Sequence, residues 1–205
     1  MPSTVETPGN QNDTPNGEAN LQYVKTFSAN MEAAPDGACI ATCTAHLVER
    51  GDDPSRFHER MKAASEETGE LAEDLFTPDG RLLPEHRVLQ ITRNEVLDWT
   101  DPPLDSDDVL TFTHIKIAKA YRRKGLGKDL VQGILHEASE GKRLSAFVAP
   151  GALESDYKDL EGEERARVIK EQVDICVQFW YSLGFRRVKK TNWMALKVRP
   201  HARAA

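Results

Sequence analysis

The sequence contains few cysteines and no long apolar run. Cys39, Cys43 and Cys176 are its three thiols, and a small, odd number of cysteines in a chain without a secretory signal indicates reduced thiols. No uninterrupted apolar stretch approaches the roughly 18–20 residues that a transmembrane helix needs. The first residues form neither a basic leader nor an apolar segment, which argues against a secretory signal. We therefore expect a cytoplasmic protein, or a nuclear one, with no membrane contact.

Basic residues are outnumbered as well. The 27 Lys and Arg against 33 Asp and Glu give a net charge of −6. Proteins that bind nucleic acid generally present a basic surface, so we expect no nucleic-acid partner, and any site for a polyanion has to be local. The composition, 39% hydrophobic and 29% charged over 205 residues, is typical of a globular domain.

Residues 1–20 differ from the rest of the chain. They are rich in Pro, Asn, Gly, Thr and Asp and have almost no large apolar side chains. Such a segment cannot bury enough surface to offset the entropy lost on ordering. We predict a disordered tail at 1–20, followed by a single domain at 21–205.

The alternation of residues 39–47 predicts a β-strand with one apolar face of small residues. Cys39, Cys43 and His46 have a spacing that suggests metal ligands. Successive side chains of a strand point to opposite faces, so His46 points away from both thiols. A zinc site would need all three to converge, and we therefore expect no metal.

Capping signals predict two helices after this strand. Asp53 before Pro54 is typical of a helix start, and Ser65 is typical of the N-cap of a second helix. A turn with the sequence Thr-Pro-Asp-Gly follows at 77–80. Farther on, 87–92 has the composition of a strand, and 101–108 that of an acidic loop.

From residue 109 the pattern alternates between strand and helix. We predict a strand at 109–118, a helix at 128–140, a strand at 143–149, a helix at 163–181 with Ile169, Val173, Cys176 and Trp180 as its apolar seam, and a strand or hairpin at 186–198. Elements in this order predict an α/β fold around one sheet.

The turn between the first strand and the first helix of this region has the features of a pyrophosphate site. Its sequence at 120–128 is Ala-Tyr-Arg-Arg-Lys-Gly-Leu-Gly-Lys. Gly125 and Gly127 let the backbone turn sharply and let a ligand approach the amides. The helix that follows offers unpaired N–H groups and a partial positive charge at its N-terminus. Four cationic side chains surround the same point: Arg122, Arg123, Lys124 and Lys128.

Two common phosphate-binding motifs do not fit this turn. A Walker A loop would need glycine where Arg122 stands and a hydroxyl residue where Asp129 stands. A dinucleotide fingerprint would need a third glycine at Leu130. The pattern that remains is Arg-x-x-Gly-x-Gly, formed by Arg122, Gly125 and Gly127.

This pattern closely resembles the acetyl-CoA signature of the GNAT superfamily of N-acetyltransferases. A second segment, Phe-Trp-Tyr-Ser-Leu-Gly-Phe at 179–185, is similar to the superfamily's later motif and stands in the same order along the chain. The resemblance covers about 109–198 and implies a GNAT-like acyl-CoA N-acyltransferase fold, a mixed central sheet flanked by helices. The stretch at about 50–101 departs from the compact pattern and resembles the helical insertion of enlarged fungal-type members. It would serve as a substrate lid or as the surface of a homodimer, and the sequence leaves both open.

The resemblance further implies acetyl-CoA as co-substrate, bound where the strands at 109–118 and 143–149 separate, and no metal. Backbone groups of Ile115 and Ile117 would pair with the pantetheine arm. The pyrophosphate would be held by the Arg122 side chain and by the amides of the turn, namely those of Arg123, Lys124, Gly125, Leu126, Gly127 and Lys128. The reaction would be direct attack of a primary amine on the thioester in a ternary complex, with no covalent enzyme intermediate. Cys176 is accordingly interpreted as a small apolar residue.

The acid and the base are less clear in this sequence. Trp180, counted among the cofactor-binding residues, stands where the superfamily usually has its tyrosine acid, and Tyr181 follows one residue later as the candidate proton donor. A shift of one residue on a helix rotates a side chain by about 100°. His114 is the candidate base because histidine is a common general base near neutral pH, with Glu95, Asp107 and Asp108 as alternatives.

Two other classes of function stay open at this point. One is a non-catalytic module that binds acyl-CoA and has lost the acid, a hypothesis that Trp180 favours. The other is a nucleic-acid- or partner-binding protein that uses the basic turn and the cluster at 186–190, which the overall acidity disfavours. The identity of the amine acceptor is not predicted.

Overall fold

The structure is a computed structural model that describes residues 21–35, 37–86, 90–92, 95–97, 105 and 107–199. The predicted tail at 1–20 lies outside these residues. The predicted strand at 87–92 and the loop at 101–108 are described only in part. Within the described chain, no helix combines the length and apolar character that crossing a membrane requires.

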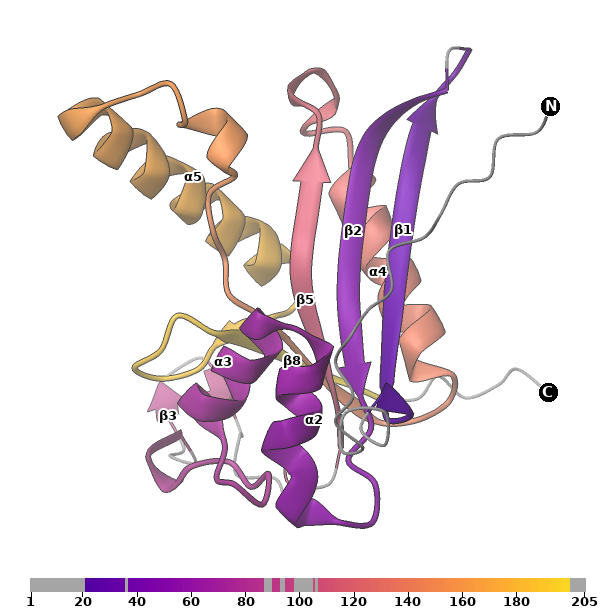
Figure 1. Cartoon of the computed structure of the whole chain (residues 1–205). Coiled ribbons are helices and arrows are strands. Elements are labelled where there is room, and N and C mark those ends of the chain that lie inside the picture. Colours follow the sequence, from indigo (N-terminus) through magenta and orange to yellow (C-terminus); the bar gives the residue numbers. More distant parts are fainter. Residues whose placement is uncertain are drawn as a thin grey trace, which may run out of the picture.

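The fold is α/β, with a six-stranded mixed open sheet flanked by helices (Figure 1). The strands in sheet order are β1 (Val24–Ala33), β2 (Ala38–Val48), β5 (Asp108–Ile117), β6 (Leu144–Val148), β8 (Met194–Val198) and β7 (Arg186–Arg187). The pair β5–β6 is parallel, and the other neighbours are antiparallel. A short hairpin of β3 (Gln90–Thr92) and β4 (Glu95–Leu97) stands apart from this sheet.

Helices cover both faces of the sheet because its central strands alternate two sets of apolar side chains. On one face, α4 (Leu126–Ser139) and the end of α5 (Gly162–Ser182) pack against the buried residues of β2, including Cys43, and against Leu110 of β5. On the other face, α2 (Phe57–Ala64) and α3 (Glu66–Leu75) pack against Val109 of β5 and Phe147 of β6. In the part of the chain that the structure describes, short 3-10 helices connect these elements: η1 (Pro54–Arg56), η2 (Pro84–His86), η4 (Lys119–Tyr121) and η5 (Glu154–Asp156).

The predicted order of elements from residue 109 is confirmed, and of the two alternatives for the closing segment the hairpin is present, formed by β7 and β8. One boundary differs: helix α4 begins at Leu126, two residues before the predicted start, because Gly125 takes a left-handed conformation (φ 87°) and serves as the N-cap. A left-handed residue is readily provided by glycine, and it lets the helix begin inside the glycine turn.

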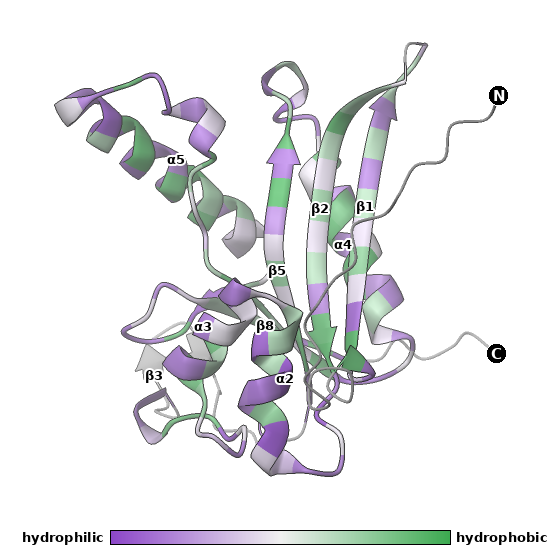
Figure 2. Ribbon diagram, in the orientation of Figure 1, coloured by the Kyte–Doolittle hydropathy of each residue, from purple (hydrophilic) through white to green (hydrophobic). Residues whose placement is uncertain are grey.

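Helix α5 extends beyond the sheet, and in Figure 1 its N-terminal turns lie away from every strand. Its buried residues are Val177 and Trp180, both in the last two turns. Hydrophobic and hydrophilic residues alternate along the exposed part (Figure 2). The predicted apolar seam is therefore buried only at Trp180, and Ile169 and Cys176 are partly exposed.

Strand β1 was not predicted. It pairs along its whole length with β2, from Val24↔Val48 to Ala33↔Ala38. Phe27, Ala29 and Met31 alternate with polar residues and pack against the core, so a period of two was present in the sequence. The polar surroundings and the small alanines masked this period.

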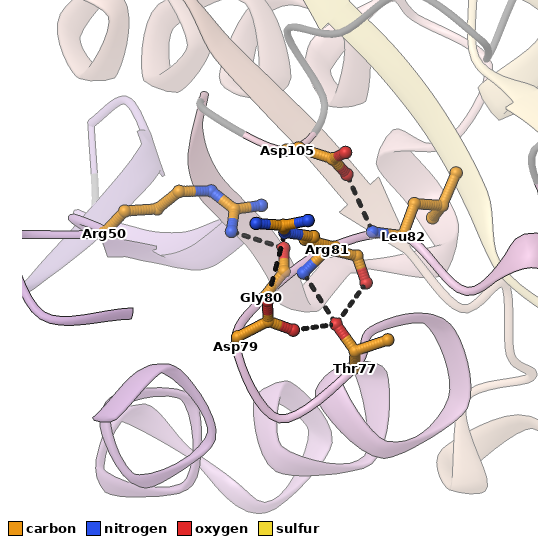
Figure 3. A network of polar contacts seen from close by, with 7 residues as sticks. All are labelled: Arg50, Thr77, Asp79, Gly80, Arg81, Leu82 and Asp105. Carbon is orange, nitrogen blue, oxygen red and sulfur yellow. Dashed lines mark hydrogen bonds and ion pairs between the residues drawn. The ribbon is translucent and has the colours of Figure 1, made fainter. Parts of the chain in front are cut away.

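Arg50 connects the inserted helices to the sheet (Figure 3). Its guanidinium donates a hydrogen bond to the carbonyl of Asp107 at 2.7 Å, and a second to the carbonyl of Gly80 in the turn after α3. The Asp108 carboxylate accepts a hydrogen bond from the backbone N–H of Arg50 at 3.1 Å. The guanidinium also lies over the Phe57 ring, 4.6 Å from its centroid, so that one side chain joins β5, α2 and the 77–80 turn.

The predicted caps of the inserted helices are confirmed. The Asp53 carboxylate accepts a hydrogen bond from Ser55 N at 3.0 Å, and the Ser65 hydroxyl accepts one from Thr68 N at 3.1 Å. The turn at 77–80 closes with a hydrogen bond from Gly80 N to the Thr77 carbonyl at 2.8 Å. Asp53 thus caps η1, which leads directly into α2, and Ser65 caps α3.

Replacing Ser65 by alanine is expected to lower the free energy of unfolding by about 1–2 kcal/mol. The change removes the N-cap acceptor of α3 and also the partner of the buried Thr68 hydroxyl, which lies 2.9 Å from the Ser65 oxygen. Urea denaturation measures the difference. The matched control is Ser55→Ala, an exposed serine in η1, for which a change below about 0.5 kcal/mol is expected. Equal losses in both variants would contradict the role of the cap.

Candidate functional site

A gap opens between the two parallel strands at the centre of the sheet. Pairing of β5 with β6 runs from Asp108↔Leu144 to Phe112↔Val148, whereas β5 continues to Ile117. After Val148 the chain leaves the sheet through Pro150 and Gly151. The last five residues of β5 therefore have no strand neighbour on the β6 side. Apart from the Ile117 carbonyl, which accepts a hydrogen bond from Arg122 Nε, backbone groups on that edge can pair with another extended chain.

A β-bulge marks the point where this gap begins. The register between β2 and β5 passes from Thr44↔His114 directly to Ala45↔Phe112, so Thr113 is the extra residue. A bulge increases local twist and re-aims neighbouring side chains, and bulges are enriched beside active sites. Here it lies directly after Phe112, the last residue of β5 that pairs with β6.

The unpaired end of β5 forms one wall of a cleft of about 1110 Å³. Its other walls are the glycine turn, the connection that follows β6, and the inner side of α5. Ten of the twelve residues predicted for the site line this cleft: His114, Ile115, Ile117, Arg122, Arg123, Gly125, Leu126, Gly127, Lys128 and Trp180. Residues far apart in the sequence thus converge on one cavity, which is large enough for a cofactor-sized molecule.

The glycine turn presents the N-terminus of α4 to the cleft. Arg123 and Gly125 both have positive φ angles, 64° and 87°, and this sharp reversal places the first turn of α4 at the cleft wall. The N-cap is glycine and has no side chain that would satisfy the free N–H groups of that turn. Such a helix end carries a partial positive charge and binds anions.

Gly127 is needed where α4, α5 and β5 approach each other. A Cβ atom at this position would lie 3.3 Å from Phe179 Cζ and 3.7 Å from Ile115 Cδ1. A larger side chain would have to displace the Phe179 ring or project into the cleft. Both glycines of the motif therefore have a structural reason, Gly125 its conformation and Gly127 its contacts.

The Arg122 side chain is engaged by a residue that the sequence analysis did not single out. Its Nε donates to the Ile117 carbonyl at 3.0 Å, and its two terminal nitrogens donate to the two carboxylate oxygens of Asp156 at 2.8 and 3.0 Å. The Asp156 side chain is only 5% exposed. No local sequence motif predicts this contact, because it joins positions 34 residues apart.

Two predicted site residues do not line the cleft. The Lys124 ammonium lies over the Tyr121 ring, 4.8 Å from its centroid. The Tyr181 ring lies under the Arg186 guanidinium at 5.9 Å. Trp180, one residue earlier, does line the cleft and packs against Phe112 with 5.3 Å between ring centroids. The rotation of one helical position therefore separates Tyr181 from the cavity.

The candidate bases divide between the two ends of β5. His114 is exposed and lines the cleft. Asp107 and Asp108 lie at the opposite end of the strand. There the Asp107 carbonyl and the Asp108 carboxylate each accept a hydrogen bond from Arg50. Burial raises the pKa of the Asp107 carboxyl, but its position removes it from the cleft. The side chain of Glu95 lies outside the described residues.

Cys176 lines the cleft, but its environment does not favour a nucleophile. Burial raises the pKa of its thiol, whereas a reactive cysteine needs a lowered pKa and its thiolate form. Cys43 is fully buried, and burial raises the pKa of its thiol to about 12. Across the described residues, no group of three or more His, Cys, Asp or Glu side chains is arranged to hold a metal ion.

No protein-family model and no curated protein matches the chain.

Proposed function

We propose that the protein is an acyl-CoA-dependent N-acyltransferase of the GNAT type, transferring an acetyl group from acetyl-CoA to a primary amine. The observation that carries the proposal is the convergence of three features on one cleft. These are the Arg122–Lys128 turn, the uncapped N-terminus of α4 and the unpaired edge of β5. The turn and the helix N-terminus suit the pyrophosphate, the edge of β5 suits the pantetheine arm, and the motif at 122–127 suggests the same ligand.

The cleft has features that suit the pyrophosphate and the pantetheine arm of acetyl-CoA. Free amides at the start of α4 suit the pyrophosphate, and Arg123 and Lys128 add positive charge beside them. The unpaired edge of β5 at Ile115 and Ile117 suits the amides of the pantetheine arm, which would pair as an added strand does. The thioester would then lie near the bulge at Thr113, under Trp180 and Phe112.

The reaction needs an amine without its proton and a proton for the departing thiolate. The amine nitrogen attacks the thioester carbonyl, the C–S bond breaks, the amine loses a proton and the thiolate gains one. His114 is the described titratable side chain on β5 that lines the cleft, and we assign it the role of base. Trp180 has no acidic proton, and we assign it to packing against the acyl end of the cofactor.

Replacing Tyr181 by phenylalanine is expected to change the rate of acetyl transfer by less than about twofold. The reason is that its ring faces Arg186 instead of the cleft. Initial rates of Tyr181→Phe and the wild type, followed by free-thiol release with the same amine, test this expectation. A loss of about 100-fold or more, as expected for removal of a general acid, would restore Tyr181 as the proton donor.

A second candidate function is a non-catalytic module that binds acyl-CoA. The position of Tyr181 outside the cleft, together with tryptophan at position 180, favours it, because the superfamily's usual acid then has no replacement on this helix. The two functions predict the same binding of acetyl-CoA but different turnover.

The deciding experiment incubates the purified protein with acetyl-CoA and a panel of primary amines, including lysine peptides, free N-terminal peptides, polyamines, amino acids and aminoglycosides. Free-thiol release that depends on one amine, with the acetylated amine seen by mass spectrometry, is the result that the enzyme proposal predicts. Binding of acetyl-CoA without turnover on any amine would support the binding module. Absence of binding would contradict both.

A further inference from the structure

One of the cationic side chains of the glycine turn, Arg122, is held by a carboxylate of the same chain. Arg122 donates from both terminal nitrogens to Asp156 at 2.8 and 3.0 Å, and the Lys119 ammonium lies 3.6 Å from the same carboxylate. Asp156 belongs to η5, in the connection between β6 and α5, and lines the same cleft as the turn. Two of the cations near the turn thus share one internal anion.

The geometry leaves little of the Arg122 fork for a ligand. Its Nε is used by the Ile117 carbonyl at 3.0 Å, and the edge formed by its two terminal nitrogens is used by Asp156. A phosphate that binds arginine bidentately needs such an edge. The neighbouring Arg122 guanidinium also holds the pKa of Asp156 below its usual value, so this carboxylate stays ionised at neutral pH.

We infer that Asp156 is an internal competitor for the anion site, and that a bound pyrophosphate group exchanges with it for Arg122. This inference rests on the proposed function and adds regulation of the same site. The exchange releases η5 from the end of β5. Helix α5 follows η5 in the chain, and its first turns have no buried residues, so releasing η5 frees α5 to change its position over the cleft.

The alternative role for Asp156 is to position Arg122 for the ligand, and it makes the opposite prediction. If Asp156 competes with the ligand for Arg122, removing its charge raises the affinity of the site for pyrophosphate. If Asp156 instead orients Arg122 toward the ligand, removing its charge lowers that affinity. Substitution of Asp156 by its neutral isostere separates the two roles by the sign of the effect.

The test is calorimetric titration of coenzyme A, and separately of inorganic pyrophosphate, into the full chain carrying Asp156→Asn. We expect both ligands to bind about three- to tenfold more tightly than to the wild type, the range of one ion pair. Asp159→Asn is the matched control, since it removes the same charge from an exposed side chain three residues later. A change of less than about twofold is expected for this control.

The two ligands distinguish the failure of this inference from failure of the proposed function. If coenzyme A binds to neither protein but pyrophosphate binds more tightly to Asp156→Asn, the inference holds and the acyltransferase proposal fails. If both ligands bind Asp156→Asn no more tightly than they bind the wild type, or if neither ligand binds the variant, the inference is overturned.

A measurement on the wild type does not depend on how the variant folds. Pyrophosphate is expected to accelerate amide hydrogen exchange at 150–161, because the connection loses its ion pairs with Arg122 and Lys119. Ligands ordinarily slow exchange where they bind, so acceleration in this segment is specific to release. Unchanged or slower exchange at 150–161 with pyrophosphate bound would overturn the inference.

Discussion

Replacing Gly127 by tryptophan is expected to weaken acetyl-CoA binding on the order of 100-fold or more. The residue lies in the first turn of α4, where the amides face the cleft and where a Cβ already meets the Phe179 ring at 3.3 Å. An indole at this position fills the approach of a phosphate to the helix N-terminus. Calorimetric titration of acetyl-CoA into the variant and the wild type measures the loss.

The matched control for this variant is Gly133→Trp. Gly133 lies in the same helix on its exposed side, and no atom lies within 4 Å of a Cβ built there. Both changes remove a helical glycine and add the same side chain, so their effects on helix propensity are similar. Affinity within about twofold of the wild type is expected for Gly133→Trp. Equal affinity of both variants would contradict a phosphate site at the start of α4.

Replacing Arg50 by alanine is expected to lower the free energy of unfolding by about 3 kcal/mol. The change leaves the carbonyls of Gly80 and Asp107 without this donor. It also removes the cation beside Asp105 and Asp108. Burial lowers the pKa of Arg50 to about 10, and the charges of these two carboxylates offset only part of that lowering. Equilibrium denaturation in urea, read by tryptophan fluorescence and by circular dichroism, measures the loss.

The control for this prediction lies in the same network (Figure 3). Arg81 pairs with Asp79 at 3.0 Å, but its side chain is 67% exposed. An exposed ion pair contributes about 0–1 kcal/mol to stability. Arg81→Ala is therefore expected to lower the free energy of unfolding by less than about 1 kcal/mol. If Arg50→Ala were equally mild, the inserted helices would be held to the sheet by their apolar contacts alone, and the role given to Arg50 would be wrong.

The elements that could be predicted from the sequence are those determined by residues close together in the chain. Asp53 and Ser65 each cap a helix through an atom two or three residues away, and Cys39–Leu47 alternates because one face of β2 is buried. The glycine turn was visible for the same reason, since its residues are adjacent in sequence. Such signals act over a few residues and can be recognised without knowledge of the tertiary structure.

What was not predictable depends on long-range contacts. Arg50 and Asp156 make their main contacts with residues 30 or more positions away, and nothing beside them in the sequence indicates a partner. The separation of Tyr181 from the cleft follows from how α5 is rotated against β5, which a motif does not specify. At the glycine turn, therefore, sequence reasoning predicted the backbone and missed the partner of the Arg122 side chain.

The most direct measurement of the central claim is amide hydrogen exchange of the wild type with and without acetyl-CoA. Binding in the cleft predicts slower exchange at 113–117, the unpaired end of β5, and at 123–128, the glycine turn, with no change in α2 and α3 on the opposite face of the sheet. Unchanged exchange throughout the chain, or protection confined to regions outside the cleft, would contradict the assignment of this site to acetyl-CoA.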